Sequence, residues 1–190
     1  MTHARLLLSI CLLALSVKTA RGQSPLPPEV ARFVEPKTNV IALETGDVNG
    51  NGRQDYLLVL EDPEQINARY LLVLVRQENG QLKLAGRNNT ILGCPTMQGA
   101  GGGIKVTPTG HGFDVQDNFG SGGVGGFKKF RFSYRKRERT WVLVTIVEGT
   151  DDIQSTPPEH IRHTQKPYEQ GTVIRFDEFR GDDFSVGCNP

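Results

Sequence analysis

The sequence shows little excess charge of either sign. Its 22 basic and 21 acidic residues leave a formal net charge of +1. A nearly neutral chain lacks the dominant basic field by which proteins attract nucleic acid, so nucleic acid is not expected as the natural partner. With 190 residues the chain is long enough for one domain around a single hydrophobic core.

Long apolar runs are also missing, so no integral membrane segment is expected in the mature chain. The longest run, Leu6–Val17, is too short to cross a bilayer. It follows a short basic start and precedes a polar stretch ending at Gly22, which is the order of a signal peptide. We expect cleavage after Gly22, one β-rich domain over residues 23–190 and a periplasmic or secreted location. A membrane-anchoring helix is the alternative.

Cysteine is scarce, and cleavage would make it scarcer. Of the three cysteines, Cys11 lies in the apolar run and would leave with the signal peptide. The remaining Cys94 and Cys188 are expected to form one disulfide, because exported proteins meet an oxidising compartment. The bridge would close a loop of roughly ninety residues, for which chain entropy gives an upper figure of about 4–5 kcal/mol. Two buried thiols are the alternative.

Helical periodicity is absent beyond the N-terminus. Pro28 at the first helical position predicts a short helix through Val34, ended by Pro36. The later apolar pattern is that of strands. They are predicted at Val40–Leu43, Tyr56–Leu60, Tyr70–Val75, Leu82–Leu84, Ile104–Val106, Phe113–Val115, Lys129–Arg135, Trp141–Val147 and Thr172–Phe176. The predicted fold class is therefore all-β with one short N-terminal helix, as antiparallel sheets in a sandwich or as a partial propeller-like arrangement.

The connections indicate which strands pair. A short link, Glu61–Arg69, suggests that the strands on either side are antiparallel neighbours, and the turn at Asn79-Gly80 predicts a hairpin. Aromatic residues alternate with polar, mostly basic ones from Lys129 to Arg135, which predicts a hairpin with one buried face. The polar segment Asp151–Gln170 is expected to be a loop, and the glycine clusters at 99–103 and 120–126 to be connections or bulges.

One segment carries recognisable chemistry, the stretch that runs from Asp47 to Asp55. Side-chain oxygens fall at positions one, three, five and nine, on Asp47, Asn49, Asn51 and Asp55. This spacing wraps a tight loop around a hard cation, and the carbonyl of Arg53 at position seven can add a ligand. Glycines 50 and 52 relieve the backbone where positive φ is needed. The alternative is an Asx-rich turn held by side-chain to backbone hydrogen bonds, without metal.

The stretch GDVNGNGRQDYLLVL resembles the calcium loop of FG-GAP or VCBS-type repeats, with asparagine in place of the two middle aspartates. The resemblance implies Ca²⁺ as cofactor. Such repeats form propeller blades, but this chain carries a single loop, so a full propeller is not expected. The layout also resembles small exported bacterial proteins that have one such loop and a glycine-rich β region. With two carboxylates, the loop is expected to bind Ca²⁺ in the extracellular class, at about 10⁻⁴–10⁻³ M.

Two segments are candidates for binding a partner. Basic residues gather between Lys128 and Arg139, and Arg131, Arg135 and Arg137 are predicted to contact an acidic partner or anionic polymer. The alternative is a solvated hairpin face. The second candidate is the glycine loop at Ser121, Gly122 and Gly123, where a loop beside a rigid hairpin could dock.

Catalytic patterns are missing. No nucleophile elbow or catalytic cysteine context occurs, and the pair His160 and His163 would share a metal only on a helical turn. We therefore expect an exported, non-catalytic, calcium-stabilised β protein that binds another protein, in its sharpest form a periplasmic inhibitor or immunity protein against a cell-wall hydrolase. The alternative is a small extracytoplasmic hydrolase with a structural calcium, because catalytic groups need not be close in sequence.

Overall fold

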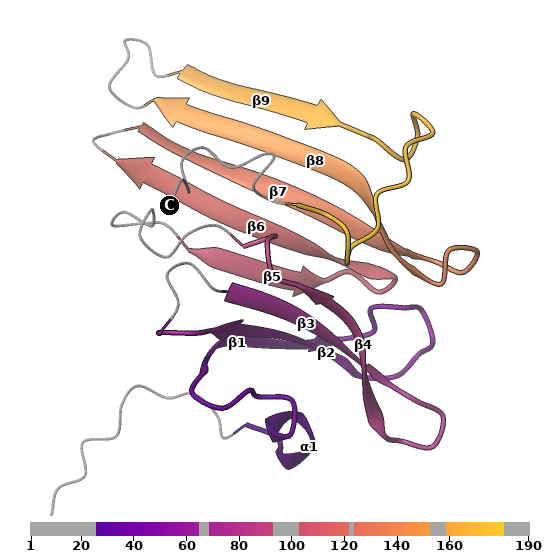
Figure 1. The fold of residues 1–190 in the computed structure, drawn as a ribbon. Helices are drawn as coiled ribbons and strands as arrows, with labels where there is room; N and C mark the ends of the chain where they lie inside the picture. Colours follow the sequence, from indigo (N-terminus) through magenta and orange to yellow (C-terminus); the bar gives the residue numbers. More distant parts are fainter. Residues whose placement is uncertain (1–25, 65–68, 93–102, 122–123, 153–158, 181–190) are drawn as a thin grey trace, which may run out of the picture.

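The computed structural model describes residues 26–64, 69–92, 103–121, 124–152 and 159–180 (Figure 1). Within them the chain forms one short helix and two antiparallel sheets, which confirms the predicted all-β class. The helix is α1 (Pro28–Ala31). The first sheet has the order β1 (Asn39–Gly46), β2 (Asp55–Glu61), β3 (Arg69–Arg76) and β4 (Leu82–Asn88). The second has the order β5 (Ile104–Pro108), β6 (Gly112–Ser121), β7 (Val124–Arg135), β8 (Thr140–Asp152) and β9 (Glu159–Gln165).

Strands β2 and β3 are buried on both faces. Alternate residues such as Leu57 and Val73 pack against the second sheet, whereas Leu58 and Leu72 face the segment that contains α1. Figure 1 shows this order of layers, with the first sheet between the second sheet and α1. Burial on both sides explains why these two strands are continuous apolar runs instead of alternating ones. The predicted antiparallel pairing of β2 with β3 and the hairpin turn at Gly80 are both present.

The second sheet has one buried face, as the alternating pattern of β7 predicted. Phe130 and Phe132 are buried, whereas Arg131 between them is exposed. Phe113 and Trp141 from the neighbouring strands join the same core. The rings of Phe113 and Phe176 meet edge-on with centroids 5.2 Å apart, a favourable aromatic geometry.

Three predicted elements, a helix, a loop and a strand, differ from those in the structure. The helix ends at Ala31, before Val34, and turns follow it. The predicted loop 151–170 contains the end of β8 and the whole of β9, which pairs with β8 along the sheet edge. Side chains of β9 from residue 160 onward are exposed, so the strand has no apolar face that a sequence pattern could show. The predicted last strand, Thr172–Phe176, is only an isolated bridge between Val142 and Arg175.

The glycine cluster 120–126 is also different from the prediction of a simple connection. Strands β6 and β7 extend into it, β6 as far as Ser121 and β7 from Val124, with Gly120 opposite Gly125 and Phe119 opposite Gly126. Backbone pairing does not depend on side chains, so a long hairpin can extend across residues that offer no apolar signal.

The C-terminal segment closes the core between the sheets. Phe176 and Phe179 are buried there. Asn88, itself buried, donates through Nδ2 to the carbonyls of Phe176 and Phe179, the latter at 2.8 Å. Its Oδ1 accepts from the backbone amides of Thr90 and Ile91, each at 2.8 Å. One side chain therefore holds the end of β4 against the C-terminal segment.

Candidate functional site

The candidate calcium loop, residues 47–55, joins β1 to β2 at the junction of the two sheets. Val48 is fully buried in the core that both sheets share. The indole Nε1 of Trp141, on β8, donates to the carbonyl of Val48 at 2.6 Å. His111, in the turn between β5 and β6, packs against Gly50 so closely that a Cβ there would lie 2.3 Å from its Nδ1. The loop is therefore attached to the second sheet as well as to its own.

Asp47 organises the loop through its carboxylate. Its Oδ1 accepts from the amides of Asn49, Gly50 and Asn51 at 3.2, 2.7 and 3.2 Å, and its Oδ2 accepts from Gly52 at 2.7 Å. Burial acts to raise the pKa of Asp47, but the four amides prevail and hold it below its usual value. Gly50 and Gly52 have φ of +76° and +75°, the left-handed conformation expected of them.

The two asparagines make Asx turns within the same loop. Asn49 Oδ1 accepts from the amide of Asn51 at 3.0 Å, and Asn51 Oδ1 accepts from that of Arg53 at 2.8 Å. These are the bonds that the metal-free alternative predicts. They do not exclude an ion, because an amide oxygen that accepts one N–H keeps a second lone pair.

Asp55 is the buried member of the donor set. It is fully inaccessible to solvent, and it accepts from the amide of Val48 at 3.1 Å and from that of Arg76 at 2.8 Å. Burial raises the pKa of Asp55, and the nearby charge of Asp47 adds to this, against the effect of the two amides. A cation in the loop would oppose both of these costs.

The donor chemistry of the loop fits Ca²⁺. Two carboxylates, two amide oxygens and a main-chain carbonyl are hard oxygen ligands, which calcium prefers. In the described residues no three histidines, cysteines, aspartates or glutamates gather around a common point. A site there would therefore depend on its amide oxygens, as the spacing of the sequence indicates.

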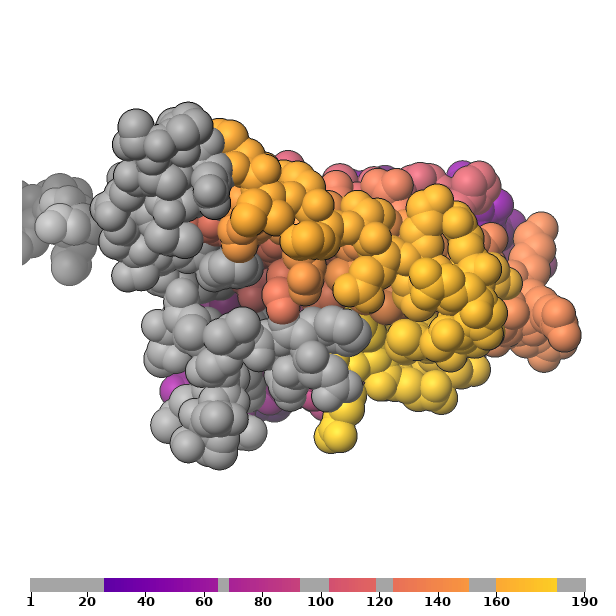
Figure 2. Space-filling view, turned by 90° about the horizontal axis from the view of Figure 1, so that it is seen from above, coloured from indigo at the N-terminus to yellow at the C-terminus, as the bar shows by residue number. Residues whose placement is uncertain are grey.

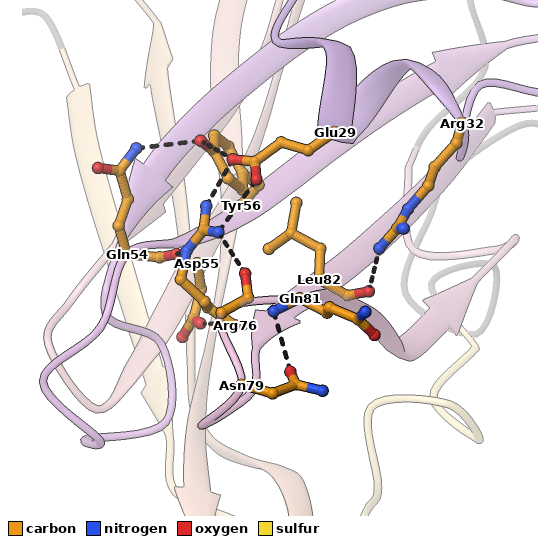
Figure 3. A network of polar contacts seen from close by, with 10 residues as sticks. Glu29, Arg32, Gln54, Asp55, Tyr56, Arg76, Asn79, Gln81 and Leu82 are labelled. Carbon is orange, nitrogen blue, oxygen red and sulfur yellow. Dashed lines mark hydrogen bonds and ion pairs between the residues drawn. The ribbon is translucent and has the colours of Figure 1, made fainter.

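Arg76, a residue that the sequence did not single out, joins the loop to α1. Its guanidinium forms an ion pair with Glu29 at 2.5 Å and donates to the carbonyls of Gln54 at 3.2 Å and Gly80 at 2.8 Å (Figure 3). Tyr56 donates to the same carboxylate at 3.0 Å. The hydrogen bond from Arg76 holds the pKa of Glu29 below its usual range. No local motif marks Arg76, because its partners Glu29 and Gln54 are distant in sequence.

Several predicted basic contacts are satisfied within the protein. Arg131 donates to both oxygens of Asp114, at 2.7 and 2.9 Å, and Lys129 lies 3.5 Å from the same carboxylate. Burial acts to raise the pKa of Asp114, but Arg131 and Lys129 lower it below its usual value. The guanidinium of Arg135 lies 4.5 Å from the ring centre of Tyr168. Arg131 is therefore already paired on the sheet, whereas Arg135 has a ring contact and a buried Nε without a hydrogen-bond partner in the described chain.

The predicted partner residues do not form one surface. Ser121 ends β6 at one end of the β6–β7 hairpin, and Gly122 and Gly123 lie outside the described residues. Arg137 lies beyond the other end of β7. A strand of 12 residues separates the two groups by about 40 Å, at about 3.3 Å per residue. Any partner contact at the basic turn is therefore separate from one at the glycine loop.

The two predicted histidines do not lie together. His160 and His163 lie three residues apart on β9, so they point to opposite faces of the sheet and cannot share a metal.

Cys94 and Cys188 lie outside the described residues, and their disulfide stays a prediction. Thr90 Oγ1 donates to the carbonyl of Phe179 at 3.0 Å, so these two residues of the described chain lie side by side. Thiol titration of the denatured, unreduced mature chain should find no free thiol, and two thiols per chain would contradict the bridge.

Comparison with known proteins adds no relative. A scan against family models matches no family, and searches of curated proteins and of solved structures find no match. Among the described residues, no helix is long and apolar enough to span a membrane.

Proposed function

We propose that the chain is an exported, non-catalytic β protein that is stabilised by Ca²⁺ and binds another protein. The observation that supports it is the position of the candidate calcium loop. Its possible ligand residues lie next to residues that are attached to both sheets, or are attached themselves. Asp47 precedes Val48, which packs in the shared core and accepts a hydrogen bond from Trp141. Asp55 ends the loop and holds the amide of Arg76 on β3.

An ion in this position would act as a structural staple. The unfolded chain cannot bring the donor residues together, so Ca²⁺ binds the folded state and stabilises it by mass action. The loop contacts β3, β8 and the β5–β6 turn. An ion that orders the loop would therefore stabilise the packing of the two sheets as well as the loop itself. This role suits a rigid scaffold that presents a surface to a partner.

The test is a thermal melt of the mature protein in EDTA, in a millimolar Ca²⁺ series and in Mg²⁺. We expect the melting temperature to rise with Ca²⁺ and to respond much less to Mg²⁺, which demands a smaller octahedral shell. Asp47→Asn should remove most of the response while keeping an oxygen for the backbone amides. Asp177→Asn is the matched control, since Asp177 is exposed and pairs with Arg175 away from the loop. A wild-type melting temperature that ignores Ca²⁺ would refute the calcium part.

The partner is to be sought by affinity capture with the mature protein from its own extracytoplasmic extract. A cell-wall hydrolase in the captured set, inhibited by the purified chain, would support the inhibitor form of the proposal. Capture of no protein in the presence or absence of Ca²⁺ would count against protein binding.

A further inference from the structure

The turn between β7 and β8 is a projecting, cationic element. The last pair of the hairpin is Arg135 with Thr140, so the turn consists of residues 136–139. Figure 2 shows this end of the hairpin, in orange, protruding beyond the rest of the molecule. Lys136, Arg137 and Arg139 are exposed. In the described chain their side chains make no hydrogen bond or ion pair, in contrast to Arg131 on the strand.

Arg139 occupies a conformation that favours glycine. Its φ is +52°, in the left-handed region that costs free energy for a residue with a Cβ. Glycine would adopt this conformation without that cost. A cation is therefore held where the backbone alone would favour another residue, and such strain is typical of functional positions.

A hollow lies beside this turn. It has a volume of about 480 Å³ and is lined by Arg137, Glu138, Tyr168, Gly171 and Val173. Val173 is an aliphatic side chain that is 50% exposed. Glu138 Oε2 is buried and has no hydrogen-bond partner within the described chain. The hollow thus offers an apolar wall and an aromatic ring, whereas the buried oxygen of Glu138 is closed to a ligand.

From these features we propose that the β7–β8 turn, defined by Lys136, Arg137 and Arg139, binds an acidic segment of a partner polypeptide, and that the adjacent hollow receives an apolar side chain of that segment. The inference rests on the proposed protein-binding function and gives its partner a chemistry. Acidic side chains complement the three cations. A polypeptide also offers an apolar side chain for Val173 and Tyr168 in the hollow. A simple polyanion has no apolar group for the hollow.

The probe is a fluorescein-labelled 12-residue peptide of mixed glutamate and leucine, titrated into the mature protein at low and high salt. Two comparison probes are the same peptide with glutamine for every glutamate, and labelled dextran sulfate. We expect the acidic peptide to bind, the glutamine peptide to bind at least about tenfold more weakly, and added salt to weaken the binding. Stronger binding of dextran sulfate than of the acidic peptide would overturn the choice of a polypeptide.

Variants then locate the contact. The triple change Lys136→Gln, Arg137→Gln and Arg139→Gln should weaken peptide binding by about tenfold or more, since three unpaired cations are removed. A control removes two exposed cations elsewhere in the sheets, through Lys83→Gln and Lys105→Gln, and should change binding by less than about twofold. Equal loss in both proteins would show a general charge effect and would overturn the assignment.

A single variant separates binding from folding. Arg139→Gly should raise the melting temperature, because it relieves the left-handed backbone, and should still weaken peptide binding. Unchanged peptide binding in this variant and in the triple variant would overturn the inference. The proposed function is tested separately: if the triple variant captures the same partners as the wild type, the protein still binds partners but by another surface.

Discussion

The substitution Asn51→Asp should destabilise the fold in the absence of Ca²⁺ and stabilise it in the presence of Ca²⁺. The change keeps the oxygen that accepts from the amide of Arg53 at 2.8 Å, so the Asx turn is preserved. It loses only a long contact of 3.4 Å from Nδ2 to the carbonyl of Arg76. The main effect is a third carboxylate in a loop that already holds Asp47 and Asp55. Without an ion the charges repel, and with an ion the added charge tightens binding.

The expected magnitude follows from mass action. If the wild-type dissociation constant is about 1 mM, then 10 mM Ca²⁺ stabilises the fold by about 1.4 kcal/mol. A tenfold tighter site would raise that gain to about 2.7 kcal/mol at the same concentration. For a domain of this size each kcal/mol corresponds to about 2–4 °C in melting temperature. In EDTA the repulsion of the new carboxylate by Asp47 and Asp55 costs at least a few tenths of a kcal/mol, or about 1 °C.

The assay is a set of four melts, of wild type and variant in EDTA and in 10 mM Ca²⁺. Asn79→Asp provides a matched control, because Asn79 Oδ1 accepts from the amide of Gln81 at 3.0 Å in a similar Asx turn (Figure 3). The control adds the same charge outside the donor set, so it should not gain stability from Ca²⁺ beyond the wild type. The reasoning is refuted if Asn51→Asp is destabilised equally in both conditions, since an ion bound by that side chain requires opposite signs.

Three further predictions follow from the packing and the charges. Trp141→Phe should destabilise the fold by about 2–4 kcal/mol in urea titrations, because it leaves the buried carbonyl of Val48 unpaired and creates a cavity; a loss below about 0.5 kcal/mol would contradict the role of this bond. The pKa of Asp114 lies below its ordinary value of 3.8, so the pairing of Asp114 with Arg131 should stabilise the fold above pH 3.8, and this stabilisation should be lost as the pH falls through the lower folded pKa. Asp114→Asn should therefore lose less stability in urea titrations between neutral and acid pH than the wild type. An acid response equal to that of the wild type would refute this prediction. Asn88→Ala should lower the free energy of unfolding by at least about 3 kcal/mol, because it leaves two carbonyls and two amides without their partner. In hydrogen exchange, the protection of backbone amides near the end of β4 should fall. Unchanged protection would mean that this side chain does not hold the C-terminal segment.

The sequence by itself determined the features that depend on neighbouring residues. The runs that form β2 and β3, the Asn79-Gly80 turn and the alternation around Phe132 all give local signals that periodicity and turn chemistry describe. The loop from Asp47 to Asp55 belongs to the same kind, because its donors and glycines lie within nine positions. The structure shows the hydrogen bonds of that loop, while the ion remains a prediction.

Only the tertiary structure decided the features that depend on distant partners. Strand β9 has exposed side chains from residue 160 onward, so its pairing comes from the free edge of β8 and leaves no pattern in its own residues. Arg131 looked available in the sequence, yet Asp114, 17 positions away, holds it. Arg76 and Trp141 connect to the loop across 22 and 93 positions. Spacing along the chain carries no information on such contacts, because the packing of one sheet on the other places these residues together.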